Sequence, residues 1–115
     1  MAEVNVSISE ELKNEILKKF KEESKIIFRQ MYSLKENPHK GKIVGNVGGI
    51  IIKELKYKSF RFYFITDGYK LKLMGELKLV ELLIKFVRMS DKKDQQKTID
   101  EIKSLLKKFD GKLGF

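Results

Sequence analysis

The first forty residues show two kinds of hydrophobic spacing. Residues 4–8 alternate apolar and polar side chains, which predicts a short strand, and Ser9 ahead of two glutamates is typical of a helix N-cap. Apolar side chains then recur every three or four residues over 12–34, as in an amphipathic helix. This repeat is interrupted at 22–24, so the segment forms either two helices in a hairpin or one long helix with a weak centre. The Asn37–Pro38 pair ends it.

The middle of the chain changes to the alternation of strands. Residues 50–57 and 59–66 predict two strands, and the Asp67–Gly68 pair that follows favours a two-residue type I′ hairpin turn. Such a turn predicts a further strand over 69–74 that pairs with 59–66. One face of this hairpin carries Phe and Leu side chains toward the helices. The other is a basic, aromatic-bearing surface formed by Arg61, Tyr63, Lys70 and Lys72.

The last third predicts one more strand and a closing helix. Residues 79–89 are highly apolar, which is typical of a central strand. Ser90 or Asp91 then caps a helix with an apolar stripe over 99–109. The predicted order is β-α-α-β-β-β-β-α, with no internal repeat or linker. We therefore expect one α+β domain over residues 1–115, with helices packed on one face of a mostly antiparallel, twisted sheet.

Composition narrows the chemistry that this domain can perform. The 115 residues include no Cys and a single His, His39, so Cys/His zinc sites, disulfides and Cys or Ser–His nucleophiles lack their usual ingredients. Any chemistry would use Lys, Arg, carboxylate, hydroxyl or amide groups. The first residues lack a basic region followed by an apolar run, and no window approaches the roughly 20 apolar residues of a spanning helix. We expect a cytoplasmic protein that does not contact a membrane.

The positive charge of the chain is concentrated in its centre. The formal net charge is +9, and residues 40–93 contribute +8 of it, with thirteen Lys or Arg against five Asp or Glu. A lysine-rich composition alone would spread the excess along the chain. Only three of the basic residues are Arg, namely Arg29, Arg61 and Arg88, so each marks a position where a planar, permanently charged group is favoured over a lysine.

Three short segments in this order resemble a known family. They are 34–42 (LKENPHKGK), 52–56 (IKELK) and 60–64 (FRFYF). They are similar to the "L-x-x-N-P-x-x-G", "K-E-L-R" and "Y-R-[IVF]-x-[YF]" signatures of the RelE/ParE toxin superfamily. Residues 86–89 with Lys92–Lys93 resemble the basic segment that follows the last strand in RelE and HigB members. The resemblance covers roughly residues 10–110.

The resemblance implies a RelE-like fold and the toxin of a type II toxin–antitoxin system. In the RelE and HigB branches such a toxin is an endoribonuclease that cuts mRNA in the ribosomal A site, without a metal or any other cofactor. The ribose 2′-hydroxyl attacks the adjacent phosphate, and the protein stabilises the added negative charge and moves two protons. The implied partners are mRNA on the ribosome and a cognate antitoxin with an acidic or partly disordered segment.

The resemblance also implies roles for particular residues. Arg61 would clamp the phosphate with two parallel hydrogen bonds. Lys53 and Lys56 would add positive charge, and either would act as the base if neighbouring cations favour its neutral form. The end of the last strand carries Arg88 and, just after it, Lys92 and Lys93. Arg88 with one of these lysines would complete the phosphate site or donate a proton to the leaving oxygen.

Further basic residues of the centre are expected to contact nucleic acid. They lie beside an aromatic side chain, a combination that favours binding of phosphates and bases. Alternatively, the lysines form a solvated strand face that blocks edge aggregation, and Arg61 pairs with Glu54 or Glu76. The expected contacts are Lys40, Lys42, Lys58, Tyr63, Lys70, Lys72 and Lys85.

Two other functions stay open at this point. ParE relatives inhibit DNA gyrase and are not ribonucleases, and an inactive relative would bind nucleic acid or antitoxin without turnover. Glu54 stands where the best-known RelE members carry a second catalytic Lys, and it is the residue expected in the HigB and ParE branches. The terminal segment has Thr98 and Ile99 where those RelE members have an aromatic residue.

Overall fold

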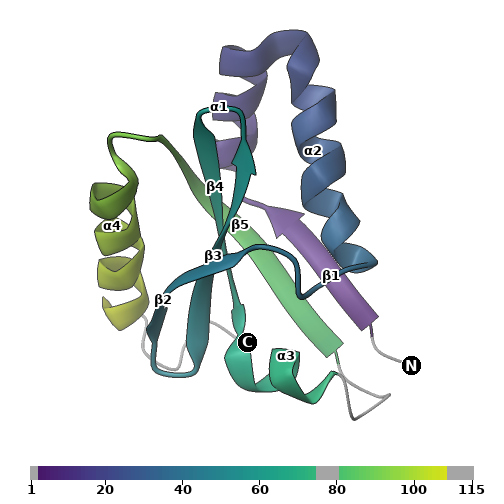
Figure 1. Cartoon of the computed structure of the whole chain (residues 1–115), viewed down its shortest axis with the longest axis vertical. Helices are drawn as coiled ribbons and strands as arrows, with labels where there is room; N and C mark the ends of the chain where they lie inside the picture. Colours follow the sequence, from purple (N-terminus) through teal and green to yellow (C-terminus); the bar gives the residue numbers. More distant parts are fainter. Residues whose placement is uncertain (1–2, 75–80, 109–115) are drawn as a thin grey trace.

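The chain folds into helices and strands that are joined mostly by short turns. A computed structural model describes residues 3–74 and 81–108 (Figure 1). The start of the strand expected over 79–89, the end of the helix expected through Phe109, and Glu76 lie outside the described residues. The elements are β1 (Glu3–Ile8), α1 (Glu10–Phe20), α2 (Ser24–Tyr32), β2 (Lys42–Val47), β3 (Ile50–Tyr57), β4 (Phe60–Asp67), α3 (Gly68–Leu73), β5 (Glu81–Asp91) and α4 (Gln95–Lys108).

The described strands form one mixed sheet in the order β1-β5-β4-β3-β2. β1 pairs with β5 in parallel, and the other three pairings are antiparallel. The prediction of a compact α+β domain with a mostly antiparallel sheet is therefore confirmed. β5, β4 and β3 are interior, and β1 and β2 form the two edges.

α1 and α2 form the helical hairpin, which was one of the two predicted alternatives. The Ser9 hydroxyl accepts a hydrogen bond of 3.3 Å from the Leu12 N–H, so it caps α1 as expected. A 3₁₀ turn at Lys21–Glu23 separates the two helices. Their shared apolar stripe is buried and packs on the sheet through Leu12, Ile16, Ile27, Met31 and, in the following 3₁₀ turn, Leu34.

The hairpin predicted at Asp67–Gly68 is wrong. The Asp67 side chain accepts a hydrogen bond of 3.0 Å from the Lys70 N–H and caps α3, so residues 68–73 form a helix and not a strand. β4 pairs instead with β3 through a tight turn at Lys58–Ser59, and with β5 on its other side. Asp before Gly suits a hairpin turn and a helix N-cap equally well, and here the cap forms. The observed order is β-α-α-β-β-β-α-β-α.

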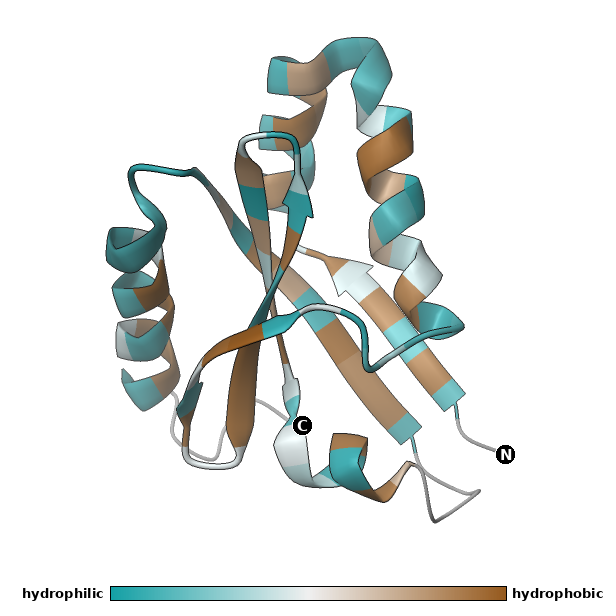
Figure 2. Ribbon diagram, viewed as in Figure 1, coloured by the Kyte–Doolittle hydropathy of each residue, from teal (hydrophilic) through white to brown (hydrophobic). Residues whose placement is uncertain are grey.

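Helices cover both faces of the sheet, which corrects the prediction of one covered face (Figure 1). α1 and α2 pack on the face that carries Phe62, Phe64 and Phe86. β3 and β4 are apolar along much of their length (Figure 2). Some of their apolar side chains lie on the opposite face, which therefore needs a cover of its own. α4 provides it, and we call this side the α4 face: Ile99, Ile102 and Leu106 of α4 pack with Ile52, Tyr63 and Ile65.

Candidate nucleic-acid interface

Strand pairing brings charged residues from four strands onto the α4 face. Residues directly opposite each other in neighbouring strands share a face, and so do residues two apart along one strand. One cross-strand row is Lys42, Glu54, Tyr63 and Arg88. The next row is Lys56, Arg61 and Ser90. We call these seven residues the polar patch. It adjoins the apolar part of the face that α4 covers.

Each arginine of the polar patch donates one hydrogen bond to the main chain. The Arg61 side chain is only 8% exposed, and its Nη1 donates to the Phe60 main-chain carbonyl at 3.2 Å. Its Nε–H is buried and has no hydrogen-bond partner. Arg88 is half-buried and its Nη1 donates to the Val87 carbonyl at 2.9 Å. A buried donor without a partner is costly, so an acceptor such as a phosphate oxygen would stabilise the Arg61 guanidinium if it reached the Nε–H.

Tyr63 belongs to the core and not to an exposed stacking surface, which corrects the prediction. Its side chain is 0% exposed, and its hydroxyl shares a hydrogen bond of 2.8 Å with Ser90 Oγ. Burial raises the pKa of the Tyr63 hydroxyl, and the bond to Ser90 offsets only part of this rise. Tyr63 therefore stays neutral, and as a buried member of the polar patch it does not contact an RNA base.

Glu54 is the one carboxylate in the polar patch. It lies between Lys42 and Tyr63 in its row and is 4% exposed. Its Oε2 is buried without a hydrogen-bond partner. It makes no ion pair with Arg61 within 4 Å; among the described residues the recorded ion pair is Lys58–Glu23. The alternative in which Arg61 pairs with Glu54 is therefore not what the structure has.

Lys53 is separated from Arg61 by the sheet itself. It lies opposite Phe64 on the face covered by α1 and α2, and it is 3% exposed. Its Nζ donates a hydrogen bond of 2.9 Å to the His39 carbonyl and lies 5.9 Å from the centre of the Phe64 ring. Burial lowers the pKa of the Lys53 ammonium. The structure therefore does not bring Lys53 to the phosphate position expected at Arg61.

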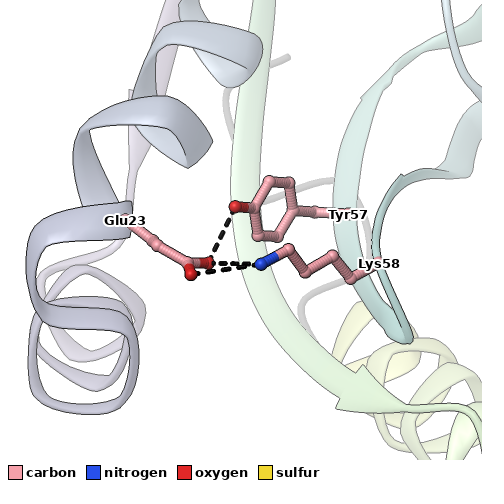
Figure 3. A network of polar contacts seen from close by, with 3 residues as sticks. All are labelled: Glu23, Tyr57 and Lys58. Atoms are coloured by element: carbon pink, nitrogen blue, oxygen red, sulfur yellow. Dashed lines mark hydrogen bonds and ion pairs between the residues drawn. The ribbon is translucent and has the colours of Figure 1, made fainter.

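Lys58 is held at the tip of the β3–β4 turn (Figure 3). Its Nζ donates to both oxygens of Glu23 at 3.1 Å, and the Tyr57 hydroxyl donates to the same carboxylate at 2.8 Å. The hydrogen bond from Tyr57, and then that from Lys58, lowers the pKa of Glu23. This contact ties the strand turn to the α1–α2 turn, so Lys58 serves the packing of the hairpins.

The other predicted contacts fall at three places. Lys92 and Lys93 are exposed in the turn after β5, where Asp91 lies opposite Phe60 next to Arg61. Lys40 is exposed in the loop before β2, and Lys85 is exposed on the α4 face opposite Ile65. Lys70 and Lys72 lie on α3, beyond the far end of β4 from Arg61, so the surface expected to unite them with Arg61 does not exist. The polar patch thus retains Lys42, Lys56, Arg61 and Arg88, with Lys92 and Lys93 nearby.

Two findings concern the wider chemistry of the described residues. Over 3–74 and 81–108, no three His, Asp or Glu side chains gather closely enough to hold a metal ion. None of the helices in those ranges has both the length and the apolar character needed to cross a membrane.

Comparison with known proteins gives no match. No family model, curated protein or solved structure matches the chain. The resemblance to RelE and ParE toxins therefore stays a prediction, and the function is inferred from the polar patch.

Two members of the polar patch were missed by sequence reasoning as site residues. The sequence presents Glu54 only as a departure from the RelE pattern or a partner of Arg61, and Ser90 only as a helix cap. The signal that identifies both is the strand register, since Glu54 lies opposite Tyr63 and Ser90 opposite Arg61. That register follows from the turn at Lys58–Ser59, and the Asp67–Gly68 pair is a stronger turn signal in the sequence.

Proposed function

We propose that the protein is a toxin of the RelE or HigB kind, a ribosome-dependent endoribonuclease that cuts mRNA without a metal. The observation that carries the proposal is the gathering of Lys42, Lys56, Arg61 and Arg88 in two adjacent cross-strand rows. None of these cations has a recorded ion pair within 4 Å among the described residues. A cluster of unpaired cations on one face is the arrangement that phosphate binding favours.

The residues of the polar patch take different roles in the proposed cleavage. The 2′-oxygen of a ribose attacks the neighbouring phosphorus and its proton passes to water, while the bond to the 5′-oxygen breaks. Arg61 and Arg88 hold the non-bridging oxygens, where negative charge increases in the transition state. Lys56 lies opposite Arg61, is exposed, and donates the proton that the departing 5′-oxygen needs. The products are a 2′,3′-cyclic phosphate and a 5′-hydroxyl.

The experiment is induced expression with paired readouts of protein synthesis and transcript ends. The parent chain should arrest translation and generate new 5′-hydroxyl ends within coding regions. Arg61→Ala should reduce cleavage on the order of 10²-fold or more, because it removes a group that stabilises the transition state.

A matched control removes a cation away from the polar patch. Lys72 is exposed on α3, and Lys72→Ala should cleave at the parental rate. Intact transcripts with undisturbed translation in cells expressing the parent would refute the proposal. So would equal losses in Arg61→Ala and Lys72→Ala, because general charge and not the polar patch would then determine activity.

The burial of Arg61 favours a second candidate, binding of nucleic acid without turnover. A guanidinium that is 8% exposed reaches a phosphate less readily than an exposed one. This candidate predicts RNA binding that weakens steeply with added salt, no new transcript ends, and harmless expression. In either case we expect the acidic segment of an antitoxin to cover the same cations.

A further inference from the structure

A cavity of about 300 Å³ lies beside α4 on the α4 face of the sheet. α4 packs over β3 and β4 through Ile102 and Leu106, so the residues that β5 places on this face stay partly exposed. The cavity occupies this space, and its volume is at the lower end of the range of small-molecule sites. Its walls are six apolar side chains from β4, β5 and α4, namely Ile65, Leu83, Val87, Ile102, Leu105 and Leu106.

A β-bulge in β5 shapes this cavity. Tyr63 of β4 pairs with Arg88. The next residue of β4 pairs with Phe86, so Val87 is the extra residue of the bulge. In a regular strand two consecutive side chains point to opposite faces. Here Val87 packs against the apolar cluster under α4, and Arg88 lies opposite Tyr63, which belongs to the same cluster. The bulge therefore places an apolar and a basic side chain together on the α4 face, and both line the cavity.

Four polar residues complete the lining. Lys85 lies opposite Ile65 on the same face and is exposed, and Arg88 is half-buried. Ser9 caps α1 with its hydroxyl, and Glu11 is exposed in the first turn of that helix. No ion pair within 4 Å joins Glu11 to either cation in the described residues. Two cations against one carboxylate leave the lining positive, which favours an anionic group on the ligand.

We propose that this cavity binds a free medium-chain fatty acid, with octanoate as the representative ligand. The hydrocarbon chain lies between α4 and β5 against the apolar walls, where removal of its surface from water supplies most of the affinity. Lys85 and Arg88 hold the carboxylate. The binding does not depend on the proposed function. A consequence for the nuclease would follow from Arg88, which belongs both to the polar patch and to this lining.

The walls distinguish this ligand from other anions. All six wall side chains are hydrocarbon, so they offer no hydrogen-bond partner to the polar edge of a nucleobase, which would lose its contacts with water on entry. An aliphatic chain has no such contacts to lose. The cavity has room for one short chain and not for the paired long chains of a membrane lipid. A free fatty acid therefore fits both the walls and the charges.

Calorimetric titration of the full chain at neutral pH and low salt tests the proposal without RNA. Octanoate should bind at a single site. Each buried methylene adds about fourfold to the affinity, so octanoate should bind roughly fifteenfold more tightly than hexanoate. 1-Heptanol carries the same hydrocarbon tail without the charge, and it should bind about tenfold more weakly than octanoate.

Two variants locate the site, and a third is their control. Lys85→Met removes one cation and should weaken octanoate about threefold while leaving 1-heptanol unchanged. Leu105 is half-buried on α4, so Leu105→Trp can fill the cavity, and it should weaken both ligands about tenfold or more. Lys25 is exposed on α2, across the sheet from the cavity, and Lys25→Met should bind both ligands as the parent does.

The comparison of ligands on the parent chain keeps the test valid if a variant fails to fold. Equal affinities for octanoate and hexanoate, or for octanoate and 1-heptanol, would overturn the proposal. So would octanoate binding that Leu105→Trp leaves unchanged, because the ligand would then lie elsewhere on the basic surface. A nucleoside monophosphate that binds more tightly than octanoate, and that Leu105→Trp excludes, would assign the cavity to RNA and overturn the proposal as well.

Discussion

The ammonium of Lys53 on β3 donates a hydrogen bond of 2.9 Å to the main-chain carbonyl of His39, 14 residues earlier. The contact fastens the loop that leads to Lys40 and Lys42 onto the side of the sheet away from the polar patch. Gly41 completes this close approach: a Cβ there would lie 3.0 Å from the Glu54 carbonyl, and its φ is +102°. Lys53 thus holds the loop before β2 in place from the side of the sheet away from the polar patch.

Burial of the Lys53 ammonium predicts a particular pH dependence of stability. Its pKa is lowered in the folded state, so the unfolded chain holds this proton more tightly. The free energy of unfolding should therefore rise with pH, from the folded pKa up to the ordinary Lys value of about 10.4. Lys53→Met has a side chain of similar length and removes this rise. In urea unfolding, the free energy of unfolding of the parent should therefore increase relative to that of the variant as pH rises through this window.

Lys72→Met is the control for this measurement, because it removes an exposed lysine that lies on α3. The difference in free energy of unfolding between Lys72→Met and the parent should not change across the same pH window. The burial of the ammonium would be contradicted if the free energies of unfolding of the parent and Lys53→Met changed equally with pH. It would also be contradicted if the parent became less stable relative to the variant as pH rises.

The Glu23 contact to Tyr57 and Lys58 predicts a second rise of stability with pH, in the acid range. The pKa of Glu23 is lowered in the folded state, first by the Tyr57 hydrogen bond. The contribution of Glu23 to the free energy of unfolding is therefore present above its unfolded-state pKa and is lost as pH falls through its folded-state pKa. Glu23→Gln should lower the Tm near neutral pH, and the difference from the parent should shrink in acid. Thermal unfolding from pH 7 to about pH 3 measures this.

Glu22→Gln provides the matched comparison, since Glu22 is the adjacent carboxylate in the same 3₁₀ turn. It should leave the Tm nearly unchanged at every pH. A Tm difference for Glu23→Gln that persists at pH 3 would contradict an electrostatic origin and indicate lost packing.

The hydrogen bond between Tyr63 and Ser90 predicts coupling between the two residues. Ser90→Ala leaves the buried Tyr63 hydroxyl without a partner, and should cost about 1–3 kcal/mol of unfolding free energy. Tyr63→Phe should cost a similar amount. The double variant should lose clearly less than the two losses combined, because neither group is then left unpaired. Additive losses in urea unfolding would contradict the shared bond.

Local patterns were sufficient for the elements whose partners lie close by in the chain. The helical stripe from Leu12 to Leu34 and the Ser9 cap depend on residues within a few turns, and both are observed. The alternation in 59–66 also correctly separated the Phe62 and Phe64 face from the Arg61 face. These features need no knowledge of the tertiary fold.

The features that failed depend on contacts distant in sequence. Asp67–Gly68 permits a turn or a cap, and only the packing of α3 decides between them. The burial of Tyr63 required a helix more than thirty residues later to cross to the other side of the sheet. Lys53 is a lysine that packs into the core, and its partner is a main-chain carbonyl that no side-chain pattern reveals.

The most direct test of the account follows the three arginines during RNA binding. The chain contains only Arg29, Arg61 and Arg88, so a nitrogen-labelled sample gives three side-chain Nε–H signals in an NMR spectrum. A short RNA with 2′-O-methyl riboses cannot be cut, and its addition should shift the Arg61 and Arg88 signals while Arg29, exposed on α2, stays in place. An unmoved Arg61 signal, or an equal shift of all three, would contradict phosphate binding at the polar patch.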